Sequence, residues 1–216
     1  MRFPSGIPVK QAVRSALVRP PRPIGLFGGT FDPPHRGHLF AASLAMRRLG
    51  LERVILIPSG HPPHKPRGGI SHSRDRLAMT RLAIRNQEGL EVSPVETRRR
   101  GTSYTIFTAR AMRKRFPGRE MYFIVGADTA RDLPTWKRYR ELFRLVRFAV
   151  IARPGCRMDS IPEFRDRFVL LHTRGIPLAS KQLRNALAGG RIPSGSIPTA
   201  VARYIRAHSL YLKRKV

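Results

Sequence analysis

A fifteen-residue stretch near the start of the chain gathers the residue types that bind phosphate groups. Residues 25–39 read GLFGGTFDPPHRGHL and include the end of an apolar run. Gly28 and Gly29 allow a turning backbone to approach a ligand closely, and the amide groups of such a turn form an anion site. His35 and His38 are three positions apart, so both imidazoles can face one ligand and donate hydrogen bonds to its oxygens. The stretch therefore predicts a polyphosphate site.

The spacing alone leaves other interpretations of this stretch open. Two glycines after a strand are common in α/β proteins, and two histidines three apart also occur in metal sites. However, no Cys or Glu lies nearby to complete a transition-metal set, and Asp32 precedes two prolines in a turn. The three-glycine dinucleotide fingerprint and the P-loop pattern are both absent.

The elements that must position this stretch alternate between apolar runs and segments with helical spacing. Strands that are apolar on both sides and alternate with helices predict a buried parallel sheet with helices on both faces. Ligands of such α/β folds bind at the carboxyl ends of the strands. We expect strands at 24–28, 53–60, 90–95, 121–128, 148–153 and 168–173, and helices at 37–49, 73–85, 103–116, 140–146, 181–190 and 197–208.

Length and composition predict one folded domain with a basic tail. The chain has 216 residues, 41% of them apolar, which is enough for one sizeable core. We expect residues 1–22 to form a flexible basic tail and residues 23–216 to form a single domain. Cys156 is the single cysteine, and no run of 18 apolar residues is present, so a disulfide framework and a membrane span are not expected. These features favour a cytoplasmic protein.

The net charge of +29 favours polyanionic partners such as nucleic acid or phosphorylated metabolites. The 42 basic residues comprise 35 Arg and 7 Lys and are spread along the whole chain. This distribution is more typical of codon bias than of a dedicated groove. We therefore expect no specific nucleic-acid partner.

Four stretches together resemble one enzyme family. GGTFDPPHRGHL (28–39) resembles the signature of the nucleotidyltransferases that carry His-x-Gly-His, and its longer form resembles the bacterial nicotinate-nucleotide adenylyltransferases. Three more stretches resemble the same branch, and the resemblance extends over about residues 24–210. They are PSGHPPHK (58–65), GTSYT (101–105) and VGADTARDLPTWKRYRELFRLVRFAVIARPG (125–155).

The resemblance implies a Rossmann-like nucleotidyltransferase fold and an adenylyl transfer from ATP to nicotinate mononucleotide, which yields deamido-NAD and pyrophosphate. It implies Mg²⁺ carried by the ATP phosphates, with no metal site made by the protein. The implied catalytic residues are His38 at the α-phosphate, His35 at the β- and γ-phosphates, and Arg184 at the departing pyrophosphate. The implied ATP-binding residues are Gly28, Gly29, Thr30, Phe31, Gly126, Asp128 and Ser180.

The same resemblance implies an acceptor site made of Lys65, Ser103, Tyr104, Thr105 and Trp136. Trp136 would stack on the pyridine ring, Lys65 would contact the acceptor phosphate, and amides at the start of a helix would bind the ring carboxylate. From spacing alone, Asp128 is either a ribose ligand or a carboxylate at a helix start.

Two departures from the family pattern are present. Phe107 stands where the family has Asp, and Lys181 stands where it has Thr in LASKQLR (178–184), which matches at Ser180 and Arg184. The alternatives that remain open are an adenylyltransferase acting on nicotinamide mononucleotide or phosphopantetheine, and a basic nucleic-acid-binding protein. The oligomeric state is also open, a homodimer included.

Overall fold

A computed structural model describes residues 20–63, 70–152, 162–174 and 180–212. Six strands form one sheet in the order β3-β2-β1-β4-β5-β6, and every neighbouring pair is parallel. The strands are β1 (Ile24–Gly29), β2 (Arg53–Pro58), β3 (Leu90–Val92), β4 (Met121–Gly126), β5 (Arg147–Ala152) and β6 (Phe168–His172). This confirms the expected Rossmann-like α/β fold with a parallel sheet.

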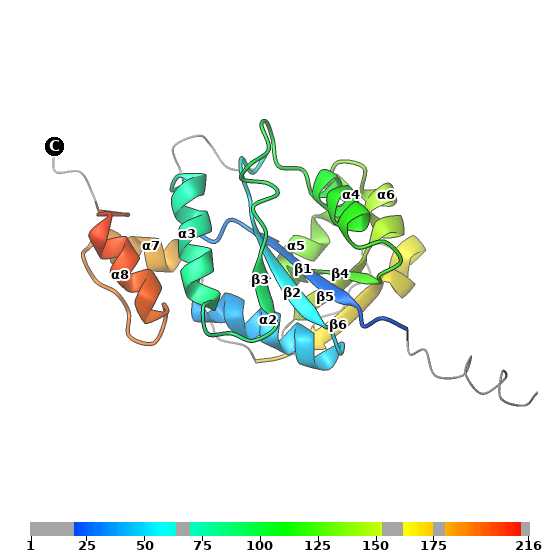
Figure 1. Cartoon of the computed structure of the whole chain (residues 1–216), viewed down its shortest axis with the longest axis horizontal. Helices are drawn as coiled ribbons and strands as arrows, with labels where there is room; N and C mark the ends of the chain where they lie inside the picture. Colours follow the sequence, from blue (N-terminus) through cyan, green and yellow to red (C-terminus); the bar gives the residue numbers. More distant parts are fainter. Residues whose placement is uncertain (1–19, 64–69, 153–161, 175–179, 213–216) are drawn as a thin grey trace, which may run out of the picture.

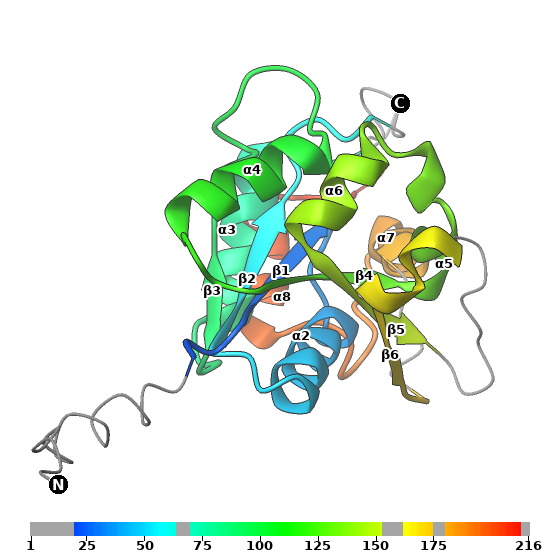
Figure 2. The ribbon, with the colours of Figure 1, turned by 90° about the vertical axis from the view of Figure 1, so that its right-hand side faces the viewer.

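Helices connect the strands and cover both faces of the sheet (Figures 1 and 2). They are α2 (Arg36–Arg48), α3 (Ser73–Ile84), α4 (Thr105–Arg115), α5 (Ala127–Arg131), α6 (Tyr139–Leu145), α7 (Ser180–Ala188) and α8 (Thr199–Ala207), with 3₁₀ turns η2 (Leu133–Thr135) and η3 (Pro162–Arg167). All six expected helices are present within two residues of their expected ends.

Alternation along the strands divides the core into two layers. In β4, Phe123 and Val125 pack with α4 and α6 on one face of the sheet, whereas Tyr122 and Ile124 pack on the other face with α2. Both faces of the strand are buried, as the apolar runs predict for a parallel sheet. A third cluster joins α3 to α7 and α8, which lie beyond α3 in Figure 1.

The strand order determines where a ligand can bind. From β3, at one edge of the sheet, the chain returns to β4, which pairs with the other side of β1. The loops after β1 and β4 therefore leave the sheet in opposite directions and open a crevice at its carboxyl edge. Gly29 and Gly126, the last residues of these strands, lie at this switch point.

The strand expected at 121–128 extends two residues too far at its C-terminal end. β4 stops at Gly126, and the next five residues form α5, which the sequence did not predict. Ala130, fully buried in the core, draws the chain into a helical turn as soon as the strand ends. Asp128 consequently lies in the first turn of a helix.

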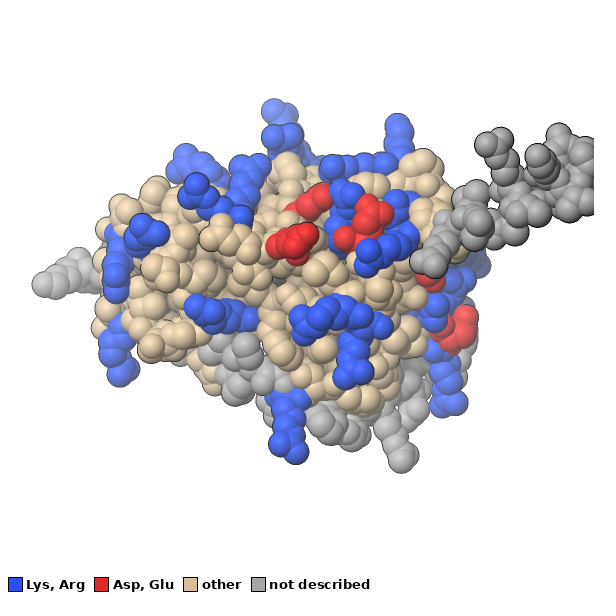
Figure 3. Space-filling view, turned by 60° about the horizontal axis from the view of Figure 1, so that its bottom comes forward, with Lys and Arg blue, Asp and Glu red and all other residues tan. Residues whose placement is uncertain are grey.

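The boundary of the expected tail at residue 22 stays a prediction, because residues 1–19 lie outside the described part. Arg22 is attached to the body through hydrogen bonds of 3.1 Å to the carbonyls of Gly50 and Leu51. Figure 3 shows Lys and Arg scattered over one face of the molecule, with a few acidic side chains among them. None of the helices in the described part is both long and apolar enough to span a membrane.

Candidate active site

A cavity of about 600 Å³ opens at the carboxyl edge of the sheet. Its wall takes residues from the ends of β1, β4 and β5, from the loops after β2 and before α4, and from the starts of α2 and α7. Segments far apart in the sequence therefore meet at the switch point, where the topology predicts a ligand.

His35 and His38 lie on this wall with their rings stacked, 3.6 Å between centroids. His35 precedes the first residue of α2, and its backbone N–H donates to Nδ1 of His38 at 3.2 Å. In the neutral His38 ring the proton is then on Nε2, which makes that atom a donor. Nδ1 of His35 is buried and has no hydrogen-bond partner among the described residues, so the nitrogen that this ring can offer a ligand is Nε2.

The two rings are electrically neutral at pH 7. Burial lowers the pKa of His35 to about 4. Burial also lowers the pKa of His38 well below its usual value, and a charge on the stacked His35 would lower it further. Neutral rings act as hydrogen-bond donors, and a bound polyanion would favour their protonation.

Gly28 and Gly29 allow aromatic side chains to pack closely against β1. The expectation that they form a sharp turn is therefore wrong. Both are the last residues of β1, and neither has a positive φ. A Cβ on Gly28 would lie 2.8 Å from the ring of Phe123, and one on Gly29 would lie 3.2 Å from the ring of Phe31. The left-handed residue of the turn is Phe31, with φ of 49°. The missing side chains thus leave room for the rings of Phe123, which lines the cavity, and of the buried Phe31.

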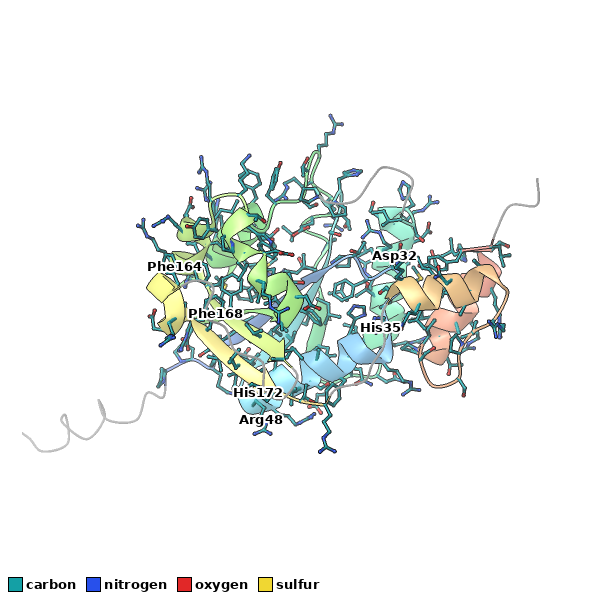
Figure 4. All side chains as sticks on the ribbon, turned by 180° about the vertical axis from the view of Figure 1, so that it is seen from behind. Asp32, His35, Arg48, Phe164, Phe168 and His172 are labelled. Carbon is teal, nitrogen blue, oxygen red and sulfur yellow. The ribbon has the colours of Figure 1, made fainter. Side chains whose placement is uncertain are left out.

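Asp32 is completely buried and links the first turn to the C-terminal part of the chain. Its carboxylate accepts hydrogen bonds from the hydroxyl of Tyr211 at 2.7 Å and from the amide of Ser71 at 3.2 Å. Its backbone carbonyl accepts from Nη1 of Arg184 at 2.9 Å. Figure 4 shows Asp32 and His35 near the start of α2, where α7 approaches it.

Arg76 is a second buried residue that connects separate loops, and it is fully shielded from solvent. Its guanidinium donates to the carbonyls of Thr30, Gly60 and Ser71 at 2.8–2.9 Å. These three carbonyls follow β1, follow β2 and precede α3, so one side chain fixes three loops around the cavity. Burial lowers the pKa of Arg76, and the nearby Asp32 charge opposes this shift.

The opposite end of the cavity is aromatic. Trp136 is half-buried and meets Phe123 edge-on, with centroids 6.2 Å apart. Tyr104 precedes the first residue of α4, Thr105, and all three of Tyr104, Thr105 and Trp136 line the cavity. Lys137 also lines it, with Nζ 4.5 Å from the centroid of the Tyr104 ring. A flat ring with an anionic group suits these surroundings.

Ser103 and Glu96 hold the loops of that end together. Oγ of Ser103 accepts from the amides of Gly60 and His61 at 3.0 and 3.1 Å. The Thr108 hydroxyl donates to the buried Glu96 carboxylate at 2.5 Å, and burial raises the pKa of Glu96. A Cβ on Gly60 would lie 2.4 Å from the Glu96 carbonyl, so only glycine fits there.

The structure brings most of the residues expected at the site together around one cavity. Those lining the cavity are Gly28, Gly29, Thr30, His35, His38, Ser103, Tyr104, Thr105, Gly126, Trp136 and Ser180. Lys65 lies outside the described residues.

Three expected residues lie elsewhere. The buried Phe31 ring packs edge-on against His38 at 5.0 Å. The Asp128 side chain is 99% exposed and pairs with Arg131 at 3.0 Å. Arg184 lies behind the first turn, and since α7 begins at Ser180, it falls in the second helical turn rather than the first.

Arg76, Glu96 and Lys137 were not expected at the site from the sequence. Arg76 carried a detectable signal, because it lies three and seven positions before Met79 and Ala83 on the apolar face of α3. A cation at a core-facing position indicates a buried partner set. The positions of Glu96 and Lys137 depend on loop packing and had no such signal.

Comparisons with known proteins agree with the fold. Residues 26–187 match the family model described as cytidylyltransferase-like. A Halalkalibacterium halodurans protein named "Probable nicotinate-nucleotide adenylyltransferase" is 41% identical over 87% of this chain and 90% of its own. A Solibacter usitatus protein of the same name is 43% identical over 87% and 98%.

A solved structure shares the fold. It is the Plasmodium falciparum nicotinic acid mononucleotide adenylyltransferase complexed with NaAD, which superimposes with a TM-score of 0.75. The match covers 88% of this chain and 97% of that one at 18% identity, a level at which the likeness supports the fold alone.

Proposed function

Because the chain belongs to the cytidylyltransferase-like family, and within it to the nicotinate-nucleotide adenylyltransferases, we propose that its cavity is the active site of an adenylyl transfer. The enzyme transfers the adenylyl group of ATP to nicotinate mononucleotide, a step of NAD biosynthesis that gives deamido-NAD and pyrophosphate. The observation that supports the site is the stacked pair of imidazoles on the wall of a cavity at the switch point.

The reaction joins two anions. An oxygen of the acceptor phosphate attacks the α-phosphorus of ATP, a new P–O bond forms, and the bond to the β-phosphate oxygen breaks as pyrophosphate leaves. The nucleophile is already ionised, so a strong general base is unnecessary. Catalysis then depends on holding both substrates in line and on stabilising the developing charge.

We assign these tasks to residues around the first turn. Nε2 of His38 donates to the α-phosphate, and His35 donates to the β- and γ-phosphates. Ser180, on the cavity wall, and Arg184 hold the pyrophosphate. Arg184 donates to the carbonyl of Asp32 through Nη1 and does not line the cavity, so its contact with the pyrophosphate requires the side chain to reorient.

The remaining assignments concern the two nucleosides. Thr30 and Gly126 border the ATP half through their backbones, and Trp136 stacks on the pyridine ring of the acceptor. At the start of α4 the amide of Thr105 faces the ring carboxylate, whereas the amide of Tyr104 donates to the Thr102 carbonyl at 3.2 Å. Asp128 pairs with Arg131, and a ribose contact from its carboxylate requires that pair to open.

Mg²⁺ is part of the proposal as an ion that arrives with ATP. Among the described residues, no three His, Cys, Asp or Glu side chains cluster closely enough to hold a metal. Phosphate oxygens and water are suitable ligands for this ion, which neutralises part of the triphosphate charge. The proposal also includes a reducing, cytoplasmic location, supported by the single Cys156.

A direct assay tests the function. The purified protein, mixed with ATP, Mg²⁺ and nicotinate mononucleotide, should form deamido-NAD and pyrophosphate in equal amounts, measured by chromatography and a coupled phosphate assay. Absence of product with nicotinate mononucleotide, together with turnover of nicotinamide mononucleotide or phosphopantetheine, would assign the chain to one of the alternatives.

A pair of variants tests the site. His38→Ala should lower kcat by about 10²–10³, because it removes one donor to the developing charge. Arg36→Gln changes the exposed residue that begins the same helix and does not line the cavity, so its kcat should stay within a few fold. Thermal unfolding of both variants checks the fold, and a His38→Ala enzyme with normal kcat would refute the assignment.

A further inference from the structure

Lys137 is the one Lys or Arg among the described residues that line the cavity. The protein carries a net charge of +29, yet the other polar groups of the cavity lining are two neutral imidazoles, one buried carboxyl, hydroxyls, the Trp136 indole and backbone groups. The ammonium of Lys137 is thus a specific local charge and differs from the general basicity of the surface.

Two aromatic rings hold this ammonium at the acceptor end. Nζ lies 4.5 Å from the centroid of Tyr104 and 5.6 Å from that of Phe107, both distances typical of cation–π contacts. Phe107 is the residue at which the chain departs from the family pattern, which has Asp there. An Asp at this position would offer Lys137 a carboxylate partner, whereas a ring leaves the ammonium able to pair with a ligand.

The backbone around Lys137 is also fixed. The amide of Trp136 donates to the Leu133 carbonyl at 3.0 Å, and the amide of Tyr139 donates to the Trp136 carbonyl at 3.1 Å. Arg138 follows with φ of 56°, which reverses the chain, and its side chain pairs with Glu141 at 3.6 Å. The backbone that carries Lys137 is therefore part of a closed turn, and the contacts that orient its exposed side chain are those with the rings of Tyr104 and Phe107.

The ring substituent is the one group of the acceptor mononucleotide whose charge a single cation can distinguish. Nicotinate and nicotinamide mononucleotides share ribose, phosphate and ring and differ in one substituent, a carboxylate or a neutral carboxamide of the same shape. Backbone amides donate to the oxygen of either substituent. A fixed ammonium distinguishes them by charge, since a charge-assisted hydrogen bond is about twice as strong as a neutral one.

Resting on the proposed function, we propose that the ammonium of Lys137 pairs with the ring carboxylate of the acceptor and selects nicotinate over nicotinamide mononucleotide. The pyridine ring lies against Trp136, the residue that precedes Lys137 in the same turn. The start of α4, at Thr105, adds its amide group and the positive end of its dipole to the same anion.

The experiment compares kcat/KM for the two mononucleotides in three variants. Lys137→Met keeps the length and the apolar stem and removes the charge, and it should lower the nicotinate-to-nicotinamide ratio at least about tenfold. Lys137→Arg should keep most of the ratio. Arg138→Met is the matched control, because it removes the adjacent charge, which does not line the cavity, and should leave the ratio unchanged.

The outcomes separate this inference from the proposed function. If wild type forms deamido-NAD and Lys137→Met keeps the ratio, with or without a loss of overall rate, the inference is wrong and the function stands. An equal loss with both mononucleotides would assign the ammonium to the phosphate that they share. If wild type forms no product from nicotinate mononucleotide, the proposed function itself fails.

Discussion

Replacing Arg76 by Met should destabilise the protein and weaken ATP binding together. Arg76 donates to the carbonyls of Thr30, Gly60 and Ser71, and it is fully buried. Met occupies a similar length of the site but donates nothing. Three carbonyls then lose a charged donor at once, and the buried Asp32 loses a nearby favourable charge.

The expected change in the free energy of unfolding follows from these contacts. A buried polar group left without its partner costs about 1–3 kcal/mol. Three such carbonyls set an upper range of about 3–9 kcal/mol, from which the released desolvation cost of the guanidinium must be subtracted. Removing one partner of a buried ionic cluster typically costs about 3–5 kcal/mol, and we expect Arg76→Met to fall in that range. Such a loss is a large part of the stability of a domain.

Urea unfolding followed by circular dichroism measures the change, with ATP affinity from calorimetry on the folded fraction. Arg81→Met is the control, since Arg81 is exposed on the same helix, and it should shift the free energy of unfolding by less than about 0.5 kcal/mol. Arg76→Lys should recover part of the loss. A cost below about 1 kcal/mol for Arg76→Met, with unchanged ATP affinity, would refute the role of this residue in holding the loops.

Two further predictions concern pH. The folded protein keeps His35 neutral with a pKa of about 4, so the unfolded chain binds the extra proton as pH falls from 6.5, and wild type should lose up to about 3 kcal/mol of stability by pH 4. His35→Gln should reduce that slope in urea unfolding at pH 7, 5.5 and 4.5, and parallel curves would contradict the reasoning. The pH dependence of stability that comes from Glu96 has the opposite sign. Because its pKa is raised in the folded state, its ionisation above about pH 4 costs stability. Glu96→Gln keeps an oxygen for the Thr108 hydroxyl, so its stability relative to wild type should rise between pH 4.5 and 7.5, and a constant or falling difference would disprove the burial argument.

The strands were predictable because their residues are apolar on both sides. The run at 53–60 predicts β2, and the structure ends that strand at Pro58, two residues early. At that point the chain leaves the edge of the sheet. Ser59 lines the cavity, and the carbonyl of Gly60 accepts a hydrogen bond from Arg76. Local pattern identifies a buried strand, whereas its last residue depends on the neighbouring strand.

The first turn was predictable as a site because its chemistry is local. His35 and His38 are neighbours on any helix start, so their spacing is enough to place both rings. Arg76 has partners 46 and 16 positions away, and the partner of Asp32 at Tyr211 is 179 positions away. Such pairings arise only from the folded topology and leave little trace in the sequence.

The bond from Tyr211 to Asp32 has a consequence for how the enzyme is made. The turn that carries the histidines is translated before Tyr211, which lies 179 positions after Asp32 and supplies one hydrogen bond to its carboxylate. During synthesis the nascent protein can assemble most of its sheet while this bond is still missing. The catalytic turn therefore reaches its final hydrogen bonding only after residue 211 has left the ribosome and α8 has docked.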